Sequence, residues 1–155
     1  MNIQIKKLHP NAAAPTYESK GAGCFDLKAA TVADSMHIGS VVHEAYPVVC
    51  GTGLAFEIPQ GHAMLIFSRS GHGFKDDVRL ANCVGIVDSD YRGEVKVKLT
   101  CDADAPDDEP GFFVKPGDRI AQALIVKADQ VTFSFADDLT DTERGEGGFG
   151  STGQA

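Results

Sequence analysis

Glycine and proline divide this chain into short pieces. Its 155 residues include 17 Gly and 7 Pro, scattered from end to end, and few of the intervals between them are long enough for a helix. Several intervals alternate apolar and polar residues with period two, which is typical of strands with one wet face. These intervals are 3–6, 95–99 and 131–135. Two others, 63–67 and 121–126, are continuously apolar and predict strands buried on both faces.

This pattern predicts a single all-β domain. Many short strands separated by Gly, Pro and Asp turns are typical of a sandwich, a jelly roll or a barrel. A brief helix is possible around 69–78, where two glycines weaken it. The composition changes only near the end, where 144–153 contain five Gly in ten residues. That segment is expected to be mobile unless a ligand or a neighbouring subunit orders it.

The charge and hydropathy of the chain argue against several partners. The chain has 14 Lys and Arg against 22 Asp and Glu, a net charge of −8, whereas proteins that bind nucleic-acid polymers usually present a basic face. No window approaches the roughly 18 consecutive apolar residues of a membrane span, and the first ten residues lack a signal peptide's apolar core. We therefore expect a cytoplasmic protein without a membrane partner. The four cysteines show neither zinc-ligand spacing nor a disulfide pattern.

One turn carries side chains suited to an anion. Arg69, Ser70 and Gly71 follow an apolar run, and such a turn can direct a guanidinium, a hydroxyl and backbone N–H groups at one ligand. An ordinary structural turn has the same composition, because Ser and Gly are favoured in turns.

The segment 82–94 carries two carboxylates and predicts a hairpin with a polar tip. Asp88 and Asp90 point to the same side of an extended strand, so they can share a cation or divide the roles of base and structural partner. Spacing alone leaves both eligible as the base, and a solvated turn is the alternative.

Two further segments admit two interpretations each. The glycine-rich segment 144–153 has the composition of a phosphate-binding loop, in which Arg144 supplies charge and Phe149 can stack on a ring. The same composition is also typical of a flexible tail. The acidic 102–109 lacks the glycine and closing glutamate of an EF-hand, which favours a solvated loop over a calcium site.

The order of these segments resembles one enzyme family. Five motifs between about residues 20 and 153 are similar to those of the trimeric deoxyuridine triphosphate nucleotidohydrolases, the dUTPases. The motifs are Gly-Cys-Phe-Asp-Leu at 23–27, Arg-Ser-Gly at 69–71, Asn-x-x-Gly-Ile-Val-Asp-Ser-Asp-Tyr-Arg-Gly-Glu at 82–94, Gly-Asp-Arg-Ile-Ala-Gln at 117–122 and Arg-Gly-x-Gly-Gly-Phe-Gly-Ser-Thr-Gly at 144–153. Cys24, Ser68 and the pair His72-Gly73 depart from the residues usual in the family.

The resemblance implies an assembly and a reaction. The subunit is expected to be a jelly roll that forms a homotrimer, with three active sites each built from parts of all three chains. Residues 1–143 form the β domain, and 144–155 form a lid over a neighbouring subunit's site. The implied reaction is hydrolysis of dUTP to dUMP and pyrophosphate with Mg²⁺ on the triphosphate, which limits uracil in DNA and supplies dUMP for thymidylate synthesis.

The resemblance also implies roles for individual residues. Asp88 activates the attacking water, Tyr91 packs under the deoxyribose and excludes a 2′-hydroxyl, and Asp26 holds Mg²⁺ through water. Uracil is read by Asn82 and by the backbone from Gly85 through Val87 to Tyr91. The residues expected around the phosphates and in the lid are Arg69, Ser70, Gly71, Gln122, Arg144, Gly148, Phe149, Gly150 and Ser151.

Two alternative functions remain open at this point. A dCTP deaminase of the same fold would act on cytosine, although the chain has no convincing counterpart of the deaminase glutamate. A nucleotide-gated protein that binds a protein partner is the other alternative, motivated by the unusual stretches 74–79 and 102–109.

Overall fold

The computed structural model of the chain describes residues 1–32, 47–102 and 112–149. These residues form ten strands and one short helix. In chain order the elements are β1 (Gln4–Lys7), β2 (Phe25–Lys28), β3 (Thr31–Val32), β4 (Val48–Gly51), β5 (Leu54–Glu57), β6 (His62–Phe67), α1 (Ser70–Lys75), β7 (Val78–Leu80), β8 (Val84–Val87), β9 (Lys96–Cys101) and β10 (Arg119–Lys127). No helix in this described part is long and apolar enough to cross a membrane.

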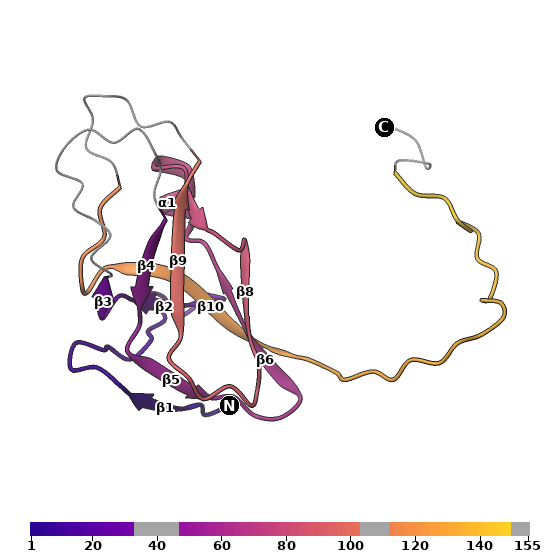
Figure 1. Cartoon of the computed structure of the whole chain (residues 1–155), viewed down its shortest axis with the longest axis horizontal. Helices are drawn as coiled ribbons and strands as arrows, with labels where there is room; N and C mark the ends of the chain where they lie inside the picture. Colours follow the sequence, from indigo (N-terminus) through magenta and orange to yellow (C-terminus); the bar gives the residue numbers. More distant parts are fainter. Residues whose placement is uncertain (33–46, 103–111, 150–155) are drawn as a thin grey trace.

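Two four-stranded antiparallel sheets make up the body of the molecule (Figure 1). Their strand orders are β2-β10-β6-β8 and β3-β4-β9-β7, and β1 pairs with β5 in a separate ribbon. Both sheets contribute to one buried cluster, which joins Leu27 and Met64 of the first sheet to Cys50, Val97 and Leu99 of the second. The all-β sandwich predicted from the sequence is therefore confirmed.

The local strand patterns explain this arrangement. Along β9, Lys96 and Lys98 are exposed whereas Val97 and Leu99 are buried, so the period-two pattern places one face in the core. The continuously apolar runs became β6 and β10, which pair with each other and each have a second neighbour. The brief helix is also confirmed, as the six residues of α1 directly after β6.

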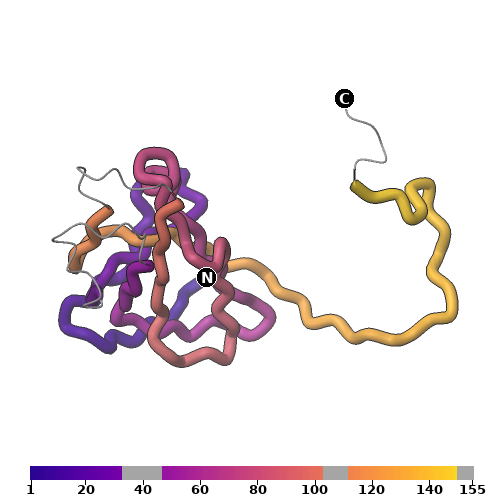
Figure 2. Tube along the Cα trace, turned by 45° about the horizontal axis from the view of Figure 1, so that its top comes forward, coloured from indigo at the N-terminus to yellow at the C-terminus, as the bar shows by residue number. Residues whose placement is uncertain are grey.

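The strand predicted over 131–135 is wrong. After β10 the chain leaves the body, and the residues from 128 to 149 run as an extended arm without a strand among those described (Figure 2). A strand needs a hydrogen-bonding neighbour, and no segment of the described chain lies beside this one. The side chains of Val131, Phe133 and Phe135 are consequently exposed, with relative accessibilities of 66%, 93% and 110%.

The hairpin predicted over 82–94 is also wrong. Strand β8 pairs with β6, whereas β9 pairs with β4 and β7, so the chain between β8 and β9 crosses from one sheet to the other. The apolar pattern predicted both strands correctly but contains no information on which neighbour each one pairs with. Because the two strands do not pair with each other, space remains between them.

Candidate active site

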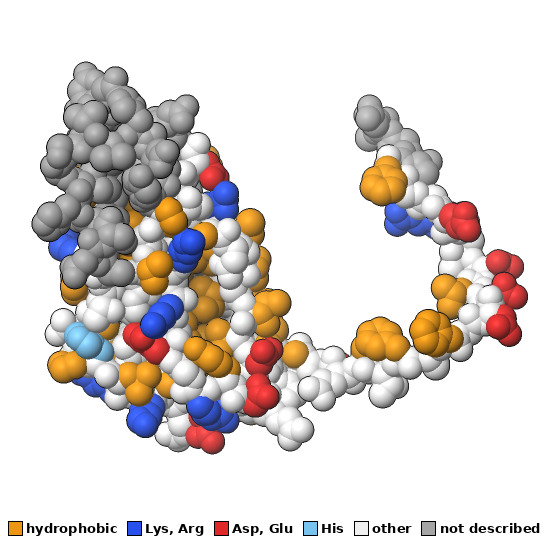
Figure 3. All heavy atoms as spheres, viewed as in Figure 1, with side chains coloured by type: hydrophobic (Ala, Val, Ile, Leu, Met, Phe, Trp, Pro, Cys, Tyr) orange, Lys and Arg blue, Asp and Glu red, His pale blue; other side chains and the backbone are white. Residues whose placement is uncertain are grey.

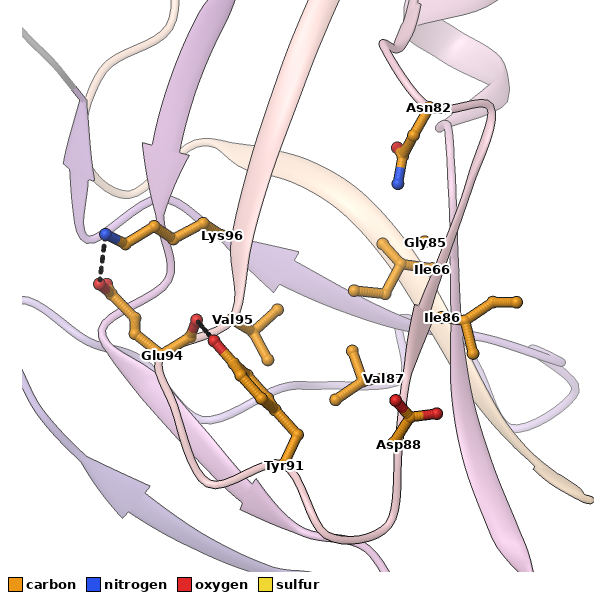
Figure 4. A pocket seen from close by; sticks show the side chains of 10 residues that line it. All are labelled: Ile66, Asn82, Gly85, Ile86, Val87, Asp88, Tyr91, Glu94, Val95 and Lys96. Carbon is orange, nitrogen blue, oxygen red and sulfur yellow. Dashed lines mark hydrogen bonds and ion pairs between the residues drawn. The ribbon is translucent and has the colours of Figure 1, made fainter.

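A pocket of about 420 Å³ lies between β8 and β9 (Figure 4). Its lining residues are Ile66, Asn82, Gly85, Ile86, Val87, Asp88, Tyr91, Glu94, Val95 and Lys96. A second pocket of about 390 Å³ shares Ile66, Asn82, Gly85 and Lys96 and continues toward Leu80 and Lys98. The two pockets together form one groove between the sheets. Apolar walls with a few polar groups at the edge are typical of a small-molecule site.

Backbone geometry places the polar edge of this groove. Val84 N donates to the Asn82 carbonyl at 2.7 Å across Cys83, whose φ of 62° makes the turn tight. At Gly85 a Cβ atom would lie 3.2 Å from the Ile66 Cβ, so glycine allows β8 to approach β6 closely. Asn82 and the β8 backbone therefore border the same space, with the Asn82 amide directed into it (Figure 4).

A tight turn carries Asp88 and Tyr91 to the far end of the groove. Tyr91 N donates to the Asp88 carbonyl at 3.2 Å, and the Tyr91 hydroxyl donates to the Glu94 carbonyl at 3.1 Å. The ring lies so close to Gly93 that a Cβ there would collide with it. The Glu94 carboxylate is held in turn by Gly53 N, which donates to Oε1 at 2.9 Å. These contacts fix the Tyr91 ring at the groove before any ligand arrives.

The structure separates the two carboxylates that spacing left equivalent. Asp88 lines the groove, and its carboxylate lies beside Val87 at the β8 side (Figure 4). Among the described residues this carboxylate has no hydrogen bond or ion pair. Asp90 is exposed and does not line the groove.

A second cluster lies around Asp26, a buried residue of β2. Its Oδ2 accepts a hydrogen bond from Arg119 Nη1 at 3.0 Å, and its Oδ1 lies 3.5 Å from Arg69 Nε. Gln122 is the register partner of Asp26 on β10, and its Nε2 donates to the Ser68 carbonyl at 3.0 Å. Arg69, Gln122 and Asp26 thus meet where β6 ends.

Ser68, one of the departures from the family pattern, has a structural use. Its carbonyl accepts from Gln122, and its Oγ accepts from Leu80 N at 2.9 Å. The residue therefore ties the end of β6 to β7. Ser70 and Gly71 follow at the start of α1, where both are exposed beside Arg69.

The donor set around Asp26 limits how a cation can bind. Both carboxylate oxygens face guanidinium groups, which would repel a metal ion bound directly to them. A hydrated Mg²⁺ that keeps its waters and binds substrate phosphates fits better, because one of those waters can bridge to the carboxylate. Within the described chain, no group of three or more His, Cys, Asp or Glu side chains could hold a metal by itself.

Asp118 supports this cluster from the turn before β10. Its carboxylate accepts from Lys115 N at 3.0 Å and lies 3.2 Å from Lys115 Nζ. Burial raises the pKa of the Asp118 carboxyl, but the Lys115 hydrogen bonds and charge outweigh this and leave the pKa below its usual value. The Asp118 carbonyl accepts from Ala29 N at 2.9 Å, which fixes the turn against the end of β2.

A single chain does not bring all the expected site residues together. The groove gathers Asn82, Gly85, Val87, Asp88 and Tyr91, whereas Arg69 lines a different pocket of about 240 Å³. Arg144, Gly148 and Phe149 belong to the arm of residues 128–149, which extends clear of the body (Figure 3). Gly150 and Ser151 fall outside the described residues.

Sequence reasoning missed two residues at these sites. Glu94 connects Tyr91 to the β4–β5 loop through Gly53, and only its place at the end of the third motif hinted at a role. His72 contacts Arg69 in the 240 Å³ pocket, and the available signal was its departure from the family's usual residues.

Comparison with known proteins places this arrangement in a family. The family model "dUTPase" matches residues 10–153. A deoxyuridine 5′-triphosphate nucleotidohydrolase of Nautilia profundicola is 41% identical over 154 residues, covering 99% of this chain and 100% of the relative. The protein of the same name from Helicobacter hepaticus is 41% identical over 155 residues, covering 100% of this chain and 90% of the relative. This chain belongs to the dUTPase family.

Solved structures agree with membership in the dUTPase family. The dUTPase of Staphylococcus bacteriophage 80alpha with dUpNHpp has a TM-score of 0.81 and 26% identity, and the match covers 99% of both chains. A variant dUTPase of phage phi11 of S. aureus, described as coordinating a structural Mg(II) ion, has a TM-score of 0.75 and 22% identity, covering 91% of this chain and 100% of that one. The second match carries the fold alone.

Proposed function

We propose that this protein hydrolyses dUTP to dUMP and pyrophosphate by attack of a water, held by Asp88, on the α-phosphorus. The dUTP substrate and the reaction rest on family membership over almost the whole chain. The observation that carries the role of Asp88 is its unpartnered carboxylate at the edge of the groove. It can accept a proton as the water oxygen bonds to phosphorus, while the bond to the bridging oxygen breaks and pyrophosphate leaves.

The groove is suited to select uracil and deoxyribose. The Asn82 side chain and the β8 backbone offer fixed donors and acceptors beside an apolar wall. Uracil presents N3–H as donor and O4 as acceptor, whereas cytosine reverses both and would leave buried groups unpaired. The Tyr91 ring is held through its hydroxyl, and it would pack under the deoxyribose, where it would exclude a 2′-hydroxyl and therefore UTP.

The second cluster is proposed to bind the phosphates. Arg69, Ser70, Gly71 and Gln122 would neutralise and orient the triphosphate, where charge accumulates as pyrophosphate departs. Asp26 would hold Mg²⁺ through water. The bound ion would neutralise the phosphates and keep them in one conformation.

Three chains are proposed to complete each site. The groove and the Arg69 cluster line separate pockets of one chain, and we propose that the triphosphate bridges the groove of one chain and the Arg69 cluster of a second copy. The arm leaves the body with Val131, Phe133 and Phe135 exposed on it, as expected for a segment that packs on a neighbour. Residues 144–155, including Arg144, Gly148, Phe149, Gly150 and Ser151, would then close over that neighbour's site as a lid.

Hydrolysis of dUTP would place the protein in nucleotide metabolism. We propose a homotrimeric cytoplasmic enzyme that keeps dUTP from DNA synthesis and supplies dUMP. No nucleic-acid polymer is required as a partner.

The test is pyrophosphate release from dUTP, UTP, dCTP and dTTP, with and without Mg²⁺, with ammonia followed in the dCTP sample. Release from dUTP alone, dependent on Mg²⁺, is the expected result. Ammonia from dCTP would instead favour the deaminase alternative. Failure of the full chain to cleave any of the four would overturn the proposal.

A further inference from the structure

His72 of α1 lies directly against Arg69, the residue proposed to bind phosphate. Its Nε2 is 3.0 Å from Arg69 Nη1. The imidazole also packs edge-on against the Phe112 ring, with centroids 4.9 Å apart.

The hydrogens of the Arg69 guanidinium can be assigned one by one. Nη1 donates to His72 Nε2 and, at 3.3 Å, to the Arg119 carbonyl, which uses both of its hydrogens. Nε faces Asp26 Oδ1 at 3.5 Å. Within the described residues, Nη2 has no partner. Three neighbours therefore engage Nη1 and Nε, and the two N–H groups of Nη2 are left for a ligand.

This contact also determines the state of the imidazole. A guanidinium can only donate, so Nε2 must be the acceptor and the ring must be neutral, with its proton on Nδ1. Nδ1 is buried without a hydrogen-bond partner among the described residues. The ring is thus held by one polar contact, to Arg69, and by its packing on Phe112.

We infer that His72 is a positioning residue for phosphate binding: its neutral imidazole fixes the Arg69 guanidinium with Nη2 free for the substrate. The inference rests on the proposed function, which assigns Arg69 to the triphosphate. A second consequence follows for pH, because a protonated His72 would present an N–H and a positive charge to Arg69 and release it.

Burial and nearby charged groups together set the protonation of the His72 ring. Burial is the largest cause and lowers the pKa of His72, and the charges of Arg69 and Arg119 lower it further. Asp76, at the end of α1, and Asp118, in the turn before β10, oppose this effect. The pKa lies below its ordinary value, so the neutral acceptor is present at neutral pH and is lost as the pH falls.

Two variants separate the hydrogen bond from packing. His72→Leu removes the acceptor and keeps an apolar side chain, whereas His72→Gln keeps an acceptor that cannot be protonated. We expect His72→Leu to weaken binding of dUpNHpp by about tenfold at about pH 8, the lower end for a hydrogen bond to a charged group. His72→Gln should stay within about threefold of the wild type. Binding of deoxyuridine, which has no phosphate, should be unchanged in both.

The pH dependence of dUpNHpp affinity distinguishes a positioning role of His72 from a purely structural one, because a purely structural role would leave it unchanged. From about pH 8 to about pH 5.5, the affinity of the wild type for dUpNHpp should fall further than that of His72→Gln, since the phosphates titrate equally in both. In ¹⁵N NMR at about pH 8, the His72 ring should show the Nδ1–H tautomer. Equal dUpNHpp affinity in wild type and His72→Leu, parallel pH profiles, or an Nε2–H tautomer would each overturn the inference.

Failure of the proposed function looks different. In that case the wild type would release no pyrophosphate from dUTP and would bind dUpNHpp no better than deoxyuridine, which would overturn both. If His72→Leu does not fold, as judged by its thermal midpoint, the comparison of wild type with His72→Gln across pH decides.

Discussion

At the scale of single residues, the proposed hydrolysis depends on one carboxylate. Asp88 lines the groove and its carboxylate has no partner in the described chain, whereas Asp90 does not line the groove. We expect Asp88→Asn to lower kcat by about 10²–10⁴-fold, the usual contribution of a general base, with dUpNHpp binding retained. The matched control, Asp90→Asn, should keep kcat within about threefold. Loss of activity in Asp90→Asn but not in Asp88→Asn would reverse the assignment.

Tyr91 is the residue proposed to select the sugar. Tyr91→Phe keeps the ring and loses the hydrogen bond to the Glu94 carbonyl, so a modest loss in kcat/KM for dUTP, about threefold, is expected. Tyr91→Ala removes the ring and should raise the ratio of UTP to dUTP hydrolysis by at least about tenfold. Steady-state kinetics with both nucleotides measure these ratios. An unchanged ratio in Tyr91→Ala would place sugar selection elsewhere.

Much of the candidate site was predictable at this scale, because the motifs name residue types in order. The family resemblance predicted Asp88 and not Asp90 as the base, whereas spacing alone could not choose between them, because the choice depends on the path of the chain between two sheets. His72 was visible only as a departure from a pattern. Arg69 directly precedes α1, and the His72 side chain contacts both Arg69 and Phe112. The sequence pattern does not predict either contact.

At the scale of elements, the loop between β4 and β5 supports the groove. Gly53 has φ of 65°, and a Cβ atom there would lie 2.8 Å from the Cβ atoms of His9 and Ala12. Gly53→Ala should therefore lower the free energy of unfolding by about 2–3 kcal/mol through backbone strain and crowding. Thermal unfolding measures this, with Gly21→Ala as the control because nothing lies within 4 Å of its added Cβ. Equal midpoints for both variants would contradict the packing described.

Some strand positions were predicted from the sequence, but strand partners were not. The apolar patterns of β6, β9 and β10 identify each strand locally. Strand β8 pairs with β6 and not with β9, although α1 and β7 separate β6 from β8 in the sequence. The local alternation of apolar and polar residues does not predict this pairing. The segment 131–135 has a strand pattern without a neighbouring strand among the described residues, as expected of a segment that pairs with another chain.

At the scale of the whole molecule, the proposed assembly explains why one chain separates its site residues. Deletion of 144–155 should leave a folded trimer, because the core lies entirely within the sandwich, and should reduce kcat by at least about 100-fold through loss of the lid. Sedimentation and circular dichroism check the assembly and fold, and pyrophosphate release checks the rate. Unfolding of the truncated chain would show instead that these residues are structural.

Complementation between two inactive proteins tests whether each active site is shared between chains. Asp88→Asn and the 144–155 deletion are co-expressed with different tags, and the mixed trimers are purified and assayed for pyrophosphate release from dUTP. If Asp88 and the lid of each site come from different chains, every mixed trimer should hold one intact site in three and show about a third of wild-type activity, whereas the two homotrimers mixed after purification stay inactive. Mixed trimers without activity would contradict a site shared between chains.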